Sequence, residues 1–237
     1  MKRRTRIFIA CSPHARVGAT TTARLLTDYF LYNNAVVEGF DLDPHESAYS
    51  ALFPGVVSVV DAADIKGQIS LFDRLLIDDG APKIVDVWRR SFERFFSTVK
   101  EIGFFEEARN RGLEAILLFH ADEQASSLAT AQALHAAWPD VTQFVVNNEG
   151  AAPLGREAPD ILARYPAAGK FAIPPLEAPV RRLLDDPELS LTRFLREPPT
   201  DMSLVVRAAL KAWIAPVFTQ FRSYELRREL EASDLFR

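Results

Sequence analysis

The residues best suited to chemistry in this 237-residue sequence form one polar segment near its start, residues 12–23. The segment follows a short apolar run, Ile7–Cys11, and leads into a stretch with amphipathic helical spacing, Thr20–Tyr32. The first N–H groups of a helix, together with its dipole, attract anions and phosphates in particular. The sequence therefore predicts an anion site between a strand and a helix.

This position is that of a P-loop, in which glycines, a lysine and a Ser/Thr hydroxyl hold the phosphates and Mg²⁺. Gly18, Thr20 and Thr21 match this pattern, although a run of threonines also caps a helix. Arg16 can bind phosphate through its guanidinium, but its Cβ limits how closely the backbone approaches a ligand. No lysine lies in the segment, so the positive charge that usually neutralises the terminal phosphates is missing.

Three carboxylates and an amide follow later predicted strands. Asp86 closes a buried strand, Lys83–Val87, where no structural need for a carboxylate is evident. Asp41 and Asp43 follow another strand and either serve the site or cap a turn. Asn147 ends a later strand and either contacts a ligand or begins a plain turn.

Together these segments resemble the ParA/MinD family of deviant Walker A ATPases. The residues that carry the likeness are Pro13–Ala23 for the loop, Asp41–His45, Ile84–Asp86 for Walker B, Asn147, and Ile173–Pro175 for the proline loop. Their order and spacing hold over roughly residues 7–185. The resemblance implies a P-loop fold and ATP or ADP with Mg²⁺ as cofactor, the alternative being that no nucleotide is bound.

The resemblance also implies roles for individual residues. Gly18, Thr20 and Thr21 would contact the nucleotide, and Thr20, Asp41 and Asp86 would hold Mg²⁺.

Further roles follow from the later motifs. Asp43 would orient the attacking water as the catalytic residue, Asn147 would contact adenine, and Pro174 would lie in the proline loop.

The loop departs from the family at its two lysines. The phosphate-binding lysine falls on Ala19, and the signature lysine that reaches a partner subunit's phosphates falls on His14. Arg16 is a candidate for the missing charge. Losing a charged donor to the developing phosphoryl charge raises the activation free energy of hydrolysis by about 3 kcal/mol or more. We therefore expect slow ATP hydrolysis or none, which favours a non-enzymatic role without deciding whether the chain is an enzyme.

The elements that position these residues alternate between short apolar runs and helical stretches, as in βαβ units. Six strands are predicted, and their ranges are Ile7–Cys11, Val36–Phe40, Lys83–Val87, Ala115–Phe119, Gln143–Asn147 and Lys170–Ile173. The fold class is α/β, a doubly wound and mostly parallel sheet with helices on both faces. Residues 1–237 are expected to form one domain, with 176–237 as a C-terminal helical layer.

Composition limits the partners. The net charge of −4 gives no global field for nucleic acid, and the single Cys11 fits a reducing cytoplasm. No apolar run approaches the roughly 20 residues of a membrane span, so membrane association is not expected. Five phenylalanines between residues 92 and 105 indicate core or dimer surface.

The leading interpretation is a nucleotide-binding switch protein with weak or absent ATP hydrolysis. The alternative is a pseudo-ATPase that binds no nucleotide and acts as a dimerising scaffold for an unknown protein partner. A homodimer is expected in either case, through nucleotide-independent contacts of residues 91–105 or of the C-terminal helix.

Overall fold

A seven-stranded sheet organises the molecule, whose computed structural model describes residues 4–234. All strand pairs are parallel, in the order β3-β2-β4-β1-β5-β6-β7. The strands are β1 (Arg6–Cys11), β2 (Glu38–Asp41), β3 (Val57–Val59), β4 (Lys83–Val87), β5 (Glu114–His120), β6 (Thr142–Asn148) and β7 (Gly169–Ile173). The predicted α/β class with a parallel sheet is confirmed.

The strand order explains where a ligand site can form. From β1 the chain runs to one side as far as β3, returns to β4, and then adds β5, β6 and β7 on the other side. Parallel sheets bind ligands outside the carboxyl ends of their strands, where the winding direction reverses. The carboxyl ends of β1, β4 and β5 therefore define the central crevice.

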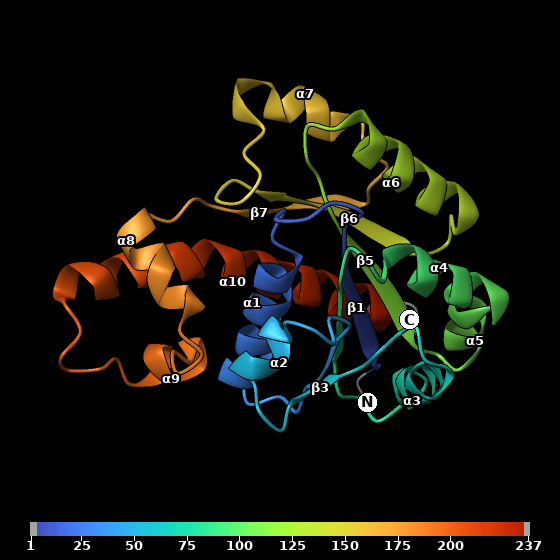
Figure 1. The fold of residues 1–237 in the computed structure, drawn as a ribbon, viewed down its shortest axis with the longest axis horizontal. Helices are drawn as coiled ribbons and strands as arrows, with labels where there is room; N and C mark the ends of the chain where they lie inside the picture. The colour runs from blue at the N-terminus through green and yellow to red at the C-terminus, as the bar shows by residue number, and fades with distance from the viewer. Residues whose placement is uncertain (1–3, 235–237) are drawn as a thin grey trace.

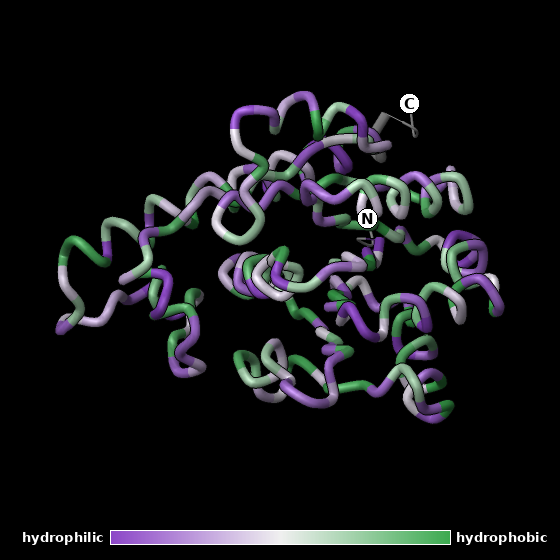
Figure 2. Tube along the Cα trace, turned by 45° about the horizontal axis from the view of Figure 1, so that its top comes forward, coloured by the Kyte–Doolittle hydropathy of each residue, from purple (hydrophilic) through white to green (hydrophobic). Residues whose placement is uncertain are grey.

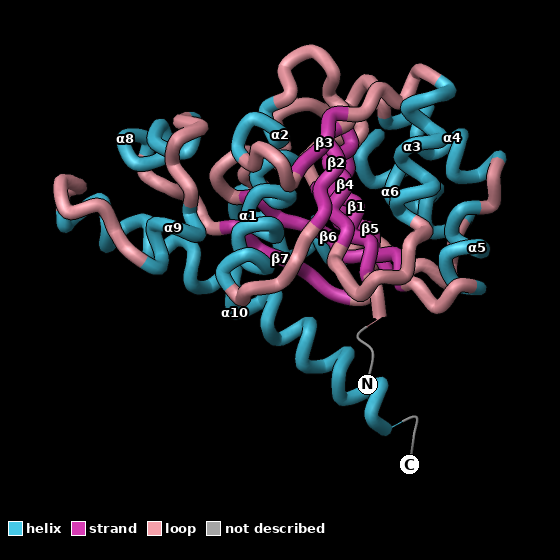
Figure 3. The backbone as a smooth tube through the Cα atoms, turned by 90° about the horizontal axis from the view of Figure 1, so that it is seen from below, coloured by secondary structure: helices cyan, strands magenta, loops and turns pink. Residues whose placement is uncertain are grey.

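Helices cover both faces of this sheet (Figure 1; Figure 3). They are α1 (Ala19–Tyr32), α2 (Ala48–Leu52), α3 (Ile65–Leu75), α4 (Phe92–Glu101), α5 (Phe104–Asn110), α6 (Ala125–Ala137), α7 (Ala158–Ala163), α8 (Ala178–Arg181), α9 (Leu191–Arg196) and α10 (Leu204–Asp234). Two short 3₁₀ helices span Gly155–Glu157 and Arg182–Asp185. Residues from α3 to α7 pack on one face, and residues from α1, α2 and α8 to α10 pack on the other.

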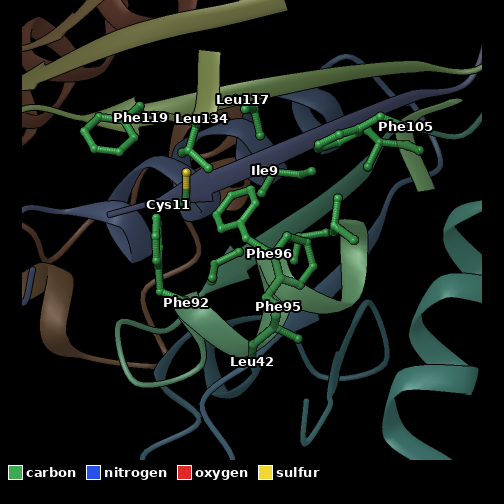
Figure 4. Packing of buried hydrophobic residues seen from close by; sticks show 14 of the residues in the cluster. Ile9, Cys11, Leu42, Phe92, Phe95, Phe96, Phe105, Leu117, Phe119 and Leu134 are labelled. Atoms are coloured by element: carbon green, nitrogen blue, oxygen red, sulfur yellow. The ribbon is translucent and has the colours of Figure 1, made fainter. Parts of the chain in front are cut away.

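The Phe-rich segment belongs to the core of the first face. Phe92, Phe95, Phe96, Phe104 and Phe105 are at most 7% exposed and pack with residues of β1, β4 and β5 (Figure 4). Phe72 of α3 adds a stacked ring contact with Phe95, at 5.8 Å between centroids. Because these rings are enclosed within the chain, the core interpretation is confirmed, and the rings are not free to form a dimer surface.

The second face is closed by α1 and by the long helix α10. Rings of α10 meet those of the sheet and of α1, as in the pairs Phe171–Phe221 and Tyr29–Phe221. The indole N–H of Trp213 donates to the Pro174 carbonyl oxygen at 2.8 Å. The C-terminal segment thus packs directly on β7 and α1.

By length and composition alone, residues 204–231 of α10 could cross a membrane, which the sequence analysis did not anticipate. The stretch includes five basic residues, which are Arg207, Lys211, Arg222, Arg227 and Arg228. Hydrophilic and hydrophobic residues are interleaved along the helices of the molecule (Figure 2). Leu210, Trp213, Ile214 and Val217 are buried against the domain core. A helix that packs on a sheet satisfies the same test of length and hydropathy, so the observation is weak evidence for a membrane span.

Three elements were missed by the sequence analysis. β3 forms the sheet edge and has only three residues, α2 has five and α7 has six, all shorter than the windows in which periodicity can be read. The predicted strand at Val36–Phe40 begins two residues later, at Glu38. The other predicted strands match to within about one residue, the accuracy with which element ends are defined.

Candidate functional site

The polar loop lies between β1 and α1, as the sequence predicts, and Gly18 ends it in a left-handed conformation with φ of 94°. A Cβ added to Gly18 would lie 2.0 Å from Nδ2 of Asn148. Arg16 also has a positive φ, 61°, and its side chain is exposed. The loop is therefore a tight, specifically packed turn that opens onto the first N–H groups of α1, for which no side chain serves as cap.

Thr20 and Asp86 are brought together at this helix start. Asp86 is the penultimate residue of β4, pairs with Ala10 of β1 and is 5% exposed, and its Oδ1 atom has no hydrogen-bond partner among residues 4–234. Burial raises the pKa of Asp86 to about 7, while the Thr20 hydroxyl favours the ionised form and the charges of Asp41 and Asp43 oppose it. A buried carboxylate oxygen without a donor is costly unless a proton or a cation neutralises it.

Asp41, in contrast, is fully used by its own chain. Its Oδ1 accepts the N–H of Asp43 at 3.0 Å, and its Oδ2 accepts the N–H groups of Tyr49 and Ser50, both at 2.9 Å. Burial raises its pKa as well. Asp41 thus holds the start of α2 in place, which is the capping alternative left open by the sequence.

Asp43 is partly committed in the same way. Its Oδ1 accepts the N–H groups of His45 and Glu46 at 3.0 and 3.1 Å, so it also organises the turn before α2. The side chain is half-buried. A role in orienting water stays a prediction.

The amide and the proline of the predicted site lie at the ends of β6 and β7. Asn147 is 7% exposed, and its Oδ1 has no hydrogen-bond partner among the described residues. Its neighbour Asn148 accepts the N–H groups of Gly150 and Ala151 and packs on Gly18. The Pro174 carbonyl is taken by Trp213. Asn147 therefore has an unused acceptor, whereas Asn148 links the two loops.

His14 is held by its own chain. Its Nδ1 lies 2.6 Å from Oδ2 of Asp122, and its Nε2 lies 3.2 Å from the hydroxyl oxygen of Ser126. These contacts join the loop to the segment after β5 and to α6. Sequence reasoning did not connect Asp122 or Ser126 with His14, because both lie more than 100 residues after it in the chain.

A second histidine supports the loop from within the core. His120 is fully buried, its Nε2 lies 2.7 Å from the Thr22 hydroxyl, and its Nδ1 lies 3.3 Å from the Cys11 carbonyl oxygen. Burial lowers the pKa of His120 to about 4. His120 thus has a structural role as a link between β1, β5 and α1.

The polar side chains around the loop offer few metal ligands of their own. Within residues 4–234 no group of three or more His, Cys, Asp or Glu side chains could hold a metal ion. Thr21 is half-buried on the first turn of α1, next to Thr20. Any divalent cation here would need oxygens from a ligand or from water in addition to Thr20 and Asp86.

The close packing of Gly18 and Asn148 leads to a testable expectation. Gly18→Ala should destabilise the protein by roughly 2–3 kcal/mol, because the new Cβ meets Asn148 and a left-handed alanine is strained. The double variant Gly18→Ala/Asn148→Ala should recover the part due to the collision, leaving about 1–2 kcal/mol. Urea denaturation of the wild type, both single variants and the double variant measures this coupling. Strictly additive effects would show that the contact is not formed.

Sequence comparisons place the chain in no family. No protein-family model matches it, and no curated protein sequence matches it. The structure is similar to that of a nucleotide-binding protein from Archaeoglobus fulgidus, solved in complex with ADP and with cobalt. The two share 14% sequence identity with a TM-score of 0.49, over 84% of this chain and 90% of the other. The fold described above rests on the sheet itself.

Proposed function

We propose that this chain is a ParA/MinD-like nucleotide-binding protein that takes ATP or ADP with Mg²⁺ and hydrolyses ATP slowly or not at all. The observation that carries the proposal is the unpartnered Oδ1 atom of the buried Asp86 at the start of α1. A cation bound near Thr20 and Asp86 would neutralise this oxygen, and the free N–H groups of α1 would receive phosphate oxygens. The Asp86 oxygen requires a positive charge and the N–H groups of α1 require a negative one, and a nucleotide bound with Mg²⁺ supplies both.

The remaining residues fit the same ligand in part. The unused Oδ1 of Asn147 can accept a hydrogen bond from an exocyclic amine such as that of adenine. The exposed side chain of Arg16 is free to reach a phosphate, as is Thr21 on the first turn of α1. Magnesium, when bound, would neutralise phosphate charge, and the residues of the chain would bind and orient it.

Calorimetric titration with ATP, ADP and GTP, each with and without Mg²⁺, tests the proposal. We expect binding that needs Mg²⁺ and that releases protons near pH 6.5, because Asp86 must lose its proton to face a cation. Asp86→Asn should weaken Mg²⁺-dependent binding about tenfold or more and abolish the proton release. Asp73→Asn, an exposed position on α3, is the matched control. Heats that are absent for all three nucleotides would refute the proposal.

Hydrolysis is expected near background, because no lysine in the loop neutralises the terminal phosphate. Ala19→Lys should raise turnover only modestly, since Arg16 still shapes the loop and His14 is held by Asp122. A phosphate-release assay on the two proteins measures this. Wild-type turnover typical of the family would contradict the expectation.

One observation favours the alternative of a scaffold without nucleotide. His14 and Gly18 are both engaged within the chain, by Asp122 and Asn148, so the loop is closed on itself without a ligand. A dimer of such a scaffold would use α10, whose Leu204, Val205 and Leu230 are exposed. Sedimentation with and without ATP and Mg²⁺ should then give the same dimer mass. A monomer that dimerises only with ATP would favour the nucleotide-dependent switch.

A further inference from the structure

Three side chains in and beside the polar loop between β1 and α1 form a continuous hydrogen-bonded series. Oδ2 of Asp122 lies 2.6 Å from Nδ1 of His14, and Nε2 of the same ring lies 3.2 Å from Oγ of Ser126. The carboxylate comes from the segment after β5, the imidazole from the loop after β1, and the hydroxyl from the first turn of α6. A hydroxyl, an imidazole and a carboxylate in this order are the parts of an activated serine nucleophile.

The carboxylate determines which nitrogen carries the proton. The Asp122 side chain is 9% exposed, its Oδ1 accepts the N–H of Gln124 at 2.8 Å, and its carbonyl accepts the Tyr165 hydroxyl at 3.1 Å. A carboxylate only accepts, so the Nδ1–H group of His14 donates to Oδ2. Nε2 is then left as an acceptor that faces the Ser126 hydroxyl. The imidazole is oriented to remove the proton of that hydroxyl.

The start of α6 supplies donors for the developing negative charge. Ser126 is the second residue of this 13-residue helix, whose first N–H groups lack intrahelical acceptors. The preceding Gln124 gives them no side-chain cap, and its carbonyl is taken by the N–H of Ser127. The N–H groups of Ala125 and Ser126 can thus receive an oxyanion next to the nucleophile. Ser126 is exposed, so a small substrate can reach it.

We propose that Ser126, His14 and Asp122 form an acyl-transfer site that cleaves small carboxylic esters. Ser126 Oγ bonds to the carbonyl carbon while its proton passes to Nε2 of His14, and the ester C–O bond breaks as that proton is returned to the leaving alkoxide. Water then repeats the sequence, giving its proton to His14, and the carboxylic acid leaves as Ser126 regains its hydrogen. Ser126 and His14 are catalytic residues, and Asp122 is a positioning residue. The proposal is independent of nucleotide binding.

Labelling with a fluorophosphonate tests the nucleophile on the full chain without nucleotide. We expect one adduct per chain, on the peptide that contains Ser126, as mapped by mass spectrometry. Ser126→Ala should lose the adduct, and Ser97→Ala, an exposed serine on α4, should keep it. An adduct spread over several serines, or equal labelling of Ser126→Ala, would overturn the proposal. The wild-type map is decisive even where a variant folds poorly.

Hydrolysis of p-nitrophenyl acetate then separates catalysis from a merely structural link. His14→Gln and Asp122→Asn should lower kcat about 100-fold or more with little change in KM, because they remove the base or its correct tautomer. Ser97→Ala is again the control. Unchanged kcat in both variants, with thermal unfolding unchanged, would mean that the series only fastens the loop to α6, and the proposal would fail.

Discussion

Replacing Asp86 by asparagine is expected to stabilise the folded protein at pH 8 by roughly 2–4 kcal/mol. The pKa of Asp86 is raised by burial from 3.8 to about 7, so the folded state holds a proton that the unfolded state releases between these values. Its stability contribution is fully present below pH 4 and is lost as pH rises to 7. Asparagine keeps the shape without the charge, so the gain should shrink to about 1–2 kcal/mol at pH 5.

Urea denaturation at pH 5 and pH 8 measures this effect, with Asp73→Asn as the control at an exposed aspartate. The control should change stability by less than about 0.5 kcal/mol at both pH values. A destabilised Asp86→Asn protein at pH 8 would mean that the carboxylate makes interactions that this structure lacks. Stabilisation accompanied by loss of Mg²⁺-dependent nucleotide binding is the pattern of a residue kept for a ligand rather than for folding.

The contribution of His120 to folding stability is expected to change with pH in the direction opposite to that of Asp86. Burial lowers its pKa from 6.5 to about 4, so the unfolded state binds a proton first as pH falls. The stability from neutral His120 is present above pH 6.5 and is lost towards pH 4, by roughly 2–3 kcal/mol. His120→Asn, which keeps a donor near the Cys11 carbonyl, should be less stable than the wild type at pH 8 because the contact with Thr22 is lost.

The test is how the difference in free energy of unfolding between His120→Asn and the wild type changes with pH. Between pH 8 and pH 4 the gap between His120→Asn and the wild type should narrow by roughly 2–3 kcal/mol. His135→Asn, an exposed histidine on α6, should show no such narrowing. Because Asp86 and Asp28 have raised pKa values of about 7 and 6, wild-type stability alone combines opposite trends. A constant gap would contradict the buried, neutral state of His120.

At this site, local sequence motifs predict where a residue lies in the fold better than they predict which groups its side chain contacts. The sequence predicted the loop between β1 and α1, and Asp86 at the end of a buried strand, and both lie there. It left open whether Asp41 has a metal role, and the structure has both of its oxygens bound to the backbone of the α2 segment. Such contacts depend on side-chain direction, which sequence spacing alone does not define.

What the sequence by itself determined is the succession of most strands and helices along the chain, because buried parallel strands leave continuous apolar runs and amphipathic helices leave a 3.6-residue period. The tertiary structure alone decided which polar groups meet. His14 lies more than 100 residues before both Asp122 and Ser126, which are only four positions apart from each other. They come together because β1 and β5 are paired neighbours whose carboxyl ends share one edge of the sheet. Side-chain pairing of this kind follows from the order of the strands within the sheet, which no local pattern encodes.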